Sequence, residues 1–111
     1  MSPKFEHFGF TDPDNNRQAG RNAVRIEAEL RLAAGQRFKV SVIDLSTTGF
    51  RIETGNYIEL GSKVYLGIPE LNSLPAVIAW SENPLYGCAF LSPLYPAVFE
   101  HIARKFPAIS R

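Results

Sequence analysis

The clearest indication of the fold is VRIEAELRL at residues 24–32, because its side chains alternate without a break between apolar and charged. Its apolar members are Val24, Ile26, Ala28, Leu30 and Leu32. An alternation with a period of two residues is typical of a β-strand that buries one face and exposes the other. The stretch therefore predicts a strand on the surface of a packed sheet.

Five further runs with strand character follow along the chain. They lie at about residues 38–45, 50–52, 64–68, 76–80 and 86–90, and turn-forming segments such as AAGQ at 33–36 separate them. Six short strands at regular spacing, joined by turns, are typical of an antiparallel barrel.

The C-terminal run AVFEHIARKF, at residues 97–106, has apolar side chains at helical spacing. Pro96 suits the first position of a helix, Lys105 favours its last turn, and Pro107 ends it. We therefore expect an all-β fold, namely a small six-stranded antiparallel β-barrel of the split-barrel type. A C-terminal helix at about residues 96–106 is expected to lie across one opening.

Length and composition indicate a single soluble domain. The chain has 111 residues, a net charge of +1 and one cysteine, Cys88, which excludes an internal disulfide bond. No apolar run approaches the roughly 18 residues that a membrane span needs. We interpret residues 1–16 as a flexible N-terminal arm and residues 17–111 as the barrel domain, and we expect a cytoplasmic monomer.

The chain offers little catalytic or metal-binding chemistry. Cys88, His7 and His101 lie far apart and lack the spacing of a zinc site, and no nucleophile–base set is present. We interpret Cys88 as a buried inert thiol and His101 as a surface residue. We therefore expect neither an enzyme nor a metalloprotein, and the small net charge argues against general DNA binding.

Two motifs stand out, and each has a plain structural explanation as well as a functional one. The first is RQAGR, with Arg17 and Arg21 four residues apart, and the second is DLSTTG, with Asp44, Ser46 and Gly49. Arginines at this spacing also occur on solvated surfaces. A DxSxxG segment also forms tight turns, in which side-chain oxygens bind backbone N–H groups and we expect glycine to supply a positive φ.

Together and in this order, the two motifs resemble the PilZ domain family. The resemblance extends over about residues 17–106 and includes the run DLSTTGFRI, the apolar strand that ends in Trp80 and the strand YGCAF. The family binds cyclic di-GMP, a bacterial second messenger. The resemblance implies that ligand, a role as a receptor that acts through an unidentified effector protein, and five ligand-binding residues. They are Arg17, Arg21, Asp44, Ser46 and Gly49.

The residue types suit such a ligand. A guanidinium forks onto a phosphate or onto guanine O6 and N7, and a carboxylate accepts guanine N–H groups. Two departures from the family pattern leave questions open. Arg25 follows Arg21 by four residues, so the arginine motif can also be Arg21 and Arg25. Many members carry another arginine before the motif, where this chain has Asn16, which leaves the number of bound ligands open.

The sequence leaves alternatives open for Trp80 and for the function of the whole chain. Trp80 is in even register with Ala76 and Ile78, which favours a place in the core over a role in stacking on a base. The whole chain is either a cyclic di-GMP receptor, a PilZ-like interaction module that binds no nucleotide, or a small barrel that binds single-stranded nucleic acid. The near-neutral charge argues against the last.

Overall fold

The computed structural model describes residues 22–108, and its strands follow the alternating runs of the sequence. Within residues 22–108 it has six strands and one helix. They are β1 (Asn22–Leu32), β2 (Arg37–Leu45), β3 (Gly49–Glu53), β4 (Lys63–Gly67), β5 (Leu74–Glu82), β6 (Leu85–Phe90) and α3 (Pro96–Lys105). The predicted all-β class, the number of strands and the C-terminal helix are confirmed.

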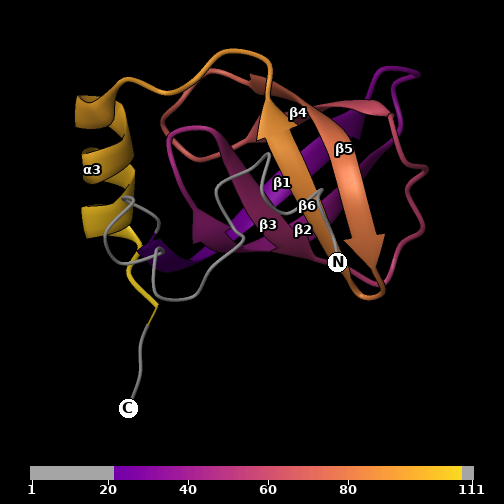
Figure 1. The fold of residues 1–111 in the computed structure, drawn as a ribbon, viewed down its shortest axis with the longest axis horizontal. Helices are drawn as coiled ribbons and strands as arrows, with labels where there is room; N and C mark the ends of the chain where they lie inside the picture. The colour runs from indigo at the N-terminus through magenta and orange to yellow at the C-terminus, as the bar shows by residue number, and fades with distance from the viewer. Residues whose placement is uncertain (1–21, 109–111) are drawn as a thin grey trace.

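The six strands close into one antiparallel barrel, in the order β1-β2-β3-β6-β5-β4 (Figure 1). Four of the pairings join strands that are consecutive in the chain. The other two, β3 with β6 and β4 with β1, close the barrel and bring together residues that are far apart in the sequence. The loop that crosses from β3 to β4 sends Ile58 into the core, where it is 2% exposed.

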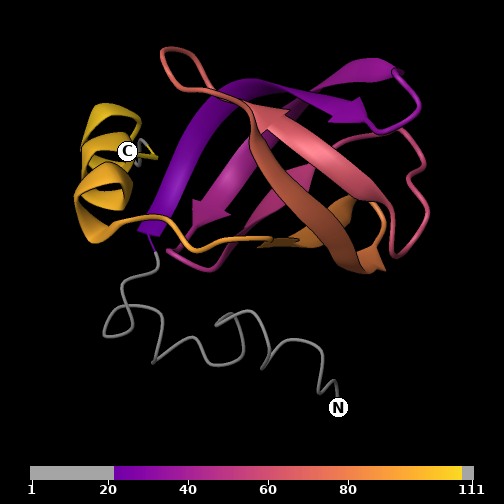
Figure 2. The same ribbon diagram turned by 90° about the horizontal axis from the view of Figure 1, so that it is seen from above.

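Helix α3 covers one end of the barrel, as Figure 2 shows. Pro96 stands at the start of the helix, and Phe99, Ile102 and Ala103 are buried in the same core as the strands. After the helix, the chain returns to β1, where the backbone N–H of Arg25 donates to the carbonyl of Phe106 at 3.1 Å. No helix among residues 22–108 has the length and hydropathy that crossing a bilayer requires.

Three β-bulges interrupt the register of the barrel, and they decide which side chains face outward. They lie between Ala23 and Ile26, between Val42 and Asp44, and between Ile78 and Trp80. An extra residue in one strand reverses the alternation beyond it. Val42 and Leu45 are therefore both fully buried, and Asp44, between the bulge and Leu45, faces away from the core.

The bulge in β5 corrects the expectation for Trp80. Regular alternation from Ile78 places Trp80 inside the barrel, but the extra residue brings it opposite Gly87 on the outer face. Trp80 is 3% exposed, yet it lies outside the main core and packs with Ala79, Leu85 and Ala89.

Cys88 is buried in the core, as the sequence indicates. Burial raises the pKa of its thiol far above the ordinary value, because a thiolate is poorly solvated there. The thiol is therefore neutral and unreactive at physiological pH. His101 lies on the exposed face of α3, also as expected.

Candidate ligand-binding site

Asp44 belongs to a row of outward-facing residues that crosses five strands of the barrel. Asp44 pairs with Ala23 on β1 and with Arg51 on β3, Arg51 pairs with Gly87 on β6, and Gly87 pairs with Trp80 on β5. We call these five residues the outer row. The arrangement follows from register alone, because residues that are opposite one another on neighbouring strands share a face.

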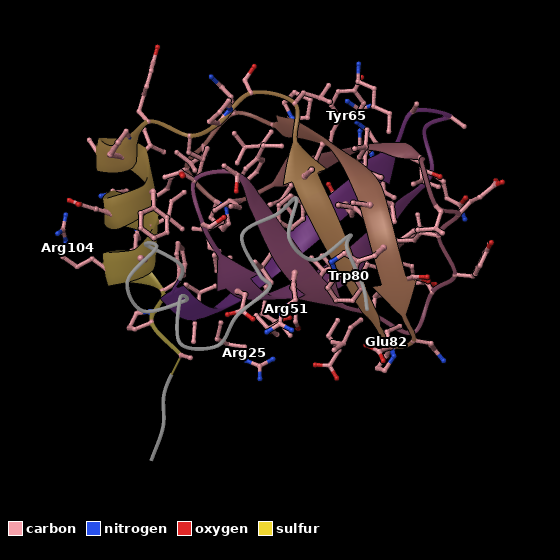
Figure 3. The ribbon with its side chains drawn as sticks, viewed as in Figure 1. Arg25, Arg51, Tyr65, Trp80, Glu82 and Arg104 are labelled. Atoms are coloured by element: carbon pink, nitrogen blue, oxygen red, sulfur yellow. The ribbon has the colours of Figure 1, made fainter. Side chains whose placement is uncertain are left out.

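In Figure 3, Arg51 and Trp80 point to the same side of the barrel, and Arg25 follows on from Arg51 along that side. Arg25 lies on β1, two residues beyond Ala23, and its side chain is exposed. The outer row therefore has a guanidinium at its centre and a second one beside the end on β1.

An ion pair between Asp44 and Arg51 holds the centre of the outer row. The Nε of Arg51 donates to Oδ2 of Asp44 at 2.7 Å, and Nη2 donates to the same oxygen. The Asp44 side chain is only 9% exposed and that of Arg51 is 27% exposed. A carboxylate that is buried to this extent requires a charged hydrogen-bond donor, which Arg51 supplies.

Sequence reasoning missed Arg51. The alternation Phe50, Arg51, Ile52 indicates that Arg51 faces outward, because both neighbours are fully buried. That Asp44 lies opposite Arg51 depends on the bulge after Val42, and the sequence carries no clear sign of that bulge.

Ser46 holds the turn that follows Asp44. Its Oγ accepts hydrogen bonds from the backbone N–H groups of Thr48 and Gly49, both at 3.1 Å. The backbone N–H of Ser46 donates to the carbonyl of Gly49 at 2.9 Å. Ser46 is 5% exposed, so its hydroxyl has a structural role as the cap of the turn, whatever else it binds.

The same turn is tied to the chain that leads into α3. The carbonyl of Thr48 accepts from the backbone N–H of Phe90 at 2.9 Å, and that of Thr47 accepts from Leu94 at 2.8 Å. Both donors are in buried residues, so these hydrogen bonds are shielded from water. The Asp44–Gly49 turn therefore has a fixed position relative to β6 and to the start of the helix.

Gly49 is required by crowding, which corrects the expectation of a positive φ. Among the described glycines, only Gly35 and Gly61 have positive φ. Gly49 instead begins β3 opposite Ala89, and a Cβ built on it would overlap the carbonyl oxygen of Cys88. The backbone of β3 approaches β6 too closely for any side chain at this position.

Gly87 is a further residue that sequence reasoning missed. A Cβ on Gly87 would overlap the indole of Trp80, so the ring lies directly across the glycine. A glycine inside a strand is a known sign of close approach by another group, and this one stands within the run YGCAF. Gly87 and Trp80 therefore form one unit at the β5 end of the outer row.

Three of the predicted ligand-binding residues, Asp44, Ser46 and Gly49, are brought together by the structure. The other two, Arg17 and Arg21, lie outside the described residues, as do Asn16 and the arm at residues 1–16. Arg25, the alternative partner of Arg21, lies on β1. Within residues 22–108, no group of His, Cys, Asp or Glu side chains is suited to hold a metal ion.

A separate hollow of about 470 Å³ beside β1 is a poorer place for an anion. Its lining includes the carboxylates of Glu27 and Glu29, with Lys39 as the one cation among its lining residues. With two carboxylates and one ammonium, the lining has a net negative charge, which repels a phosphate. The outer row, with Arg51 and the nearby Arg25, suits an anion better.

We expect the substitution Gly49→Ala to destabilise the domain by about 1–3 kcal/mol, because the added methyl group forces β3 and β6 apart. Gly55→Ala is the matched control, since a Cβ there meets nothing within 4 Å. Urea unfolding followed by circular dichroism measures both. Equal stability of the two variants would contradict the close approach at Gly49.

We expect Arg51→Gln to lower the free energy of unfolding by about 1–3 kcal/mol, because it removes a charged donor from a buried carboxylate. Arg37→Gln is the control. It breaks the pair with Glu29, in which the side chains are 61% and 52% exposed, and it should leave stability nearly unchanged. An Arg51→Gln variant as stable as the control would show that the ion pair does not support the site.

Comparison with known proteins agrees with the observed fold. The family model of the PilZ domain matches residues 15–106. Among solved structures, the chain is similar to one described as the crystal structure of the PilZ domain of CeSA from a cellulose synthesizing bacterium. That similarity has a TM-score of 0.56 and 19% sequence identity, and it covers 77% of this chain and 92% of that one. No curated protein sequence matches the chain. On the match of the family model over most of its length, the chain belongs to the PilZ domain family.

Proposed function

We propose that this chain is a receptor module for cyclic di-GMP, and that the ligand binds on the outer row and the adjoining Asp44–Gly49 turn. PilZ domains are generally receptors for this ligand. The observation that carries the proposal is the pairing of β1 with β2, in which Asn22 lies opposite Leu45 and Ala23 lies opposite Asp44. Arg21 directly precedes Asn22 in the chain, so the strand that follows the arginine motif in the sequence begins beside the DxSxxG motif.

The roles of the residues follow from their chemistry. Arg17 and Arg21 bind phosphate oxygens or the O6 and N7 edge of guanine, which a guanidinium contacts with two parallel hydrogen bonds. Asp44 accepts the N–H groups of a guanine, and Arg51 keeps its carboxylate oriented. Trp80 lies in the same row, so a ligand on the row is close to its ring.

The turn offers a path from the ligand to a surface that an effector protein can bind. Because the carbonyls of Thr47 and Thr48 are bonded to Leu94 and Phe90, a shift of the turn moves the segment before α3. We infer that ligand binding alters the position of this segment, which carries Leu91 and Tyr95, 50% and 78% exposed respectively.

We expect calorimetry to detect binding of cyclic di-GMP, and much weaker binding of GMP. Cyclic di-AMP should also bind much more weakly, because adenine lacks the O6 acceptor. Arg17→Ala and Arg21→Ala should each weaken binding by about 1–3 kcal/mol, the scale of a lost bidentate contact. Arg25→Ala tests the alternative register, in which Arg21 and Arg25 form the motif.

The outcomes separate the parts of the proposal. Equal affinity for cyclic di-AMP would contradict guanine recognition. Unchanged affinity in Arg17→Ala together with a loss in Arg25→Ala would move the motif to Arg21 and Arg25. A folded wild-type chain that binds no cyclic di-GMP would overturn the proposed function and leave an interaction module that binds no nucleotide.

A further inference from the structure

A second hollow is lined by residues of the β3–β4 loop and the β5–β6 hairpin. These two segments lie at the end of the barrel opposite α3 (Figures 1 and 2). The volume of the hollow is about 340 Å³, which is within the range of small binding sites. The lining residues are Gly55, Asn56, Tyr57, Ser81, Asn83 and Tyr86. None of these lining residues is Asp, Glu, Lys, Arg or His, so the lining itself contributes no formal charge.

Tyr57 stands at this hollow with its side chain in solvent, although its backbone is firmly held. The hydroxyl of Tyr86 donates to the carbonyl of Asn56 at 2.9 Å and accepts from the backbone N–H of Ile58, also at 2.9 Å. Both neighbours of Tyr57 are thus bound to one buried phenol, while Tyr57 itself is 81% exposed. The aromatic ring is presented by a fixed loop and adds little to the core.

The two segments that line the hollow carry charges of one sign. Glu53, Glu59 and Glu82 are exposed, and the segments 53–59 and 81–86 contain no Lys or Arg. Glu82 stands between the lining residues Ser81 and Asn83, and Glu53 pairs with Leu85 of the same hairpin. The carboxylates disfavour an anion such as a nucleotide and favour a cation.

We propose that this hollow is the docking surface for a cationic segment of a partner protein, with an Arg or Lys side chain over the ring of Tyr57. An exposed aromatic face attracts such a cation, and the surrounding carboxylates neutralise it. The Tyr, Asn, Ser and Gly of the lining are also the residue types that dominate protein-recognition loops. Leu60, 50% exposed and three residues after Tyr57, supplies an apolar contact beside the cation.

The test uses the ligand-free full chain labelled with ¹⁵N and the capped peptide Ac-Gly-Arg-Leu-Arg-Gly-NH2, with a peptide carrying Gln in place of Arg as control. We expect saturable shifts of the backbone amides of residues 55–59 and 81–83, which decrease as salt is added. Tyr57→Ser should weaken the peptide about tenfold, the scale of a partly desolvated cation–π contact.

Tyr65→Ser is the matched control, because the guanidinium of Arg31 already lies over the Tyr65 ring at 4.2 Å from its centre, and it should leave the affinity unchanged. Shifts that are the same with the Gln peptide, or that persist in Tyr57→Ser, would overturn the proposal. Shifts at these residues with the neutral sugar cellotetraose and none with the Arg peptide would also overturn it, and would assign the hollow to a saccharide. Cyclic di-GMP is absent from these titrations, so their outcome is independent of the proposed function.

Discussion

A carboxylate that is nine-tenths buried on the outside of a barrel is the constraint on which the proposed site depends. Asp44 is in that position, and the ion pair with Arg51 makes it tolerable. The pair exists because an extra residue in β2 sends Asp44 outward while Val42 and Leu45 both remain in the core. The same ion pair joins β2 to β3 immediately before the turn that Ser46 caps, so motif, turn and strand pairing support one another.

Close approach of the backbone is the second constraint, and it acts at two glycines. Gly49 lets β3 lie against the carbonyl of Cys88, and Gly87 lets the indole of Trp80 lie across β6. Gly87 belongs to the outer row, and Gly49 lies beside it at the start of β3. A methyl group at either position separates elements that the row needs in contact, so these two positions are as much part of the site as the charged residues.

The sequence predicts what depends on local pattern. The alternation in VRIEAELRL and in the later runs gave all six strands, and the spacing in residues 97–106 together with Pro96 gave the helix. Local pattern does not reveal what depends on pairing between distant strands. The bulge after Ile78 moved Trp80 out of the core, the bulge after Val42 placed Asp44 opposite Arg51, and crowding by β6 rather than a positive φ explains Gly49. The motif residues Asp44, Ser46 and Gly49 were found from the sequence, whereas Arg51 and Gly87 required the three-dimensional register.

If cyclic di-GMP binds on the outer row, Trp80 reports on that binding directly, because it belongs to the row and is the one tryptophan of the chain. Selective excitation of Trp80 during a titration with cyclic di-GMP therefore observes the site itself. Binding on the outer row should produce a saturable change in Trp80 emission, with the same dissociation constant as calorimetry and no comparable change with GMP. Calorimetric binding of cyclic di-GMP that leaves Trp80 emission unchanged would place the ligand elsewhere on the protein and contradict binding on the outer row.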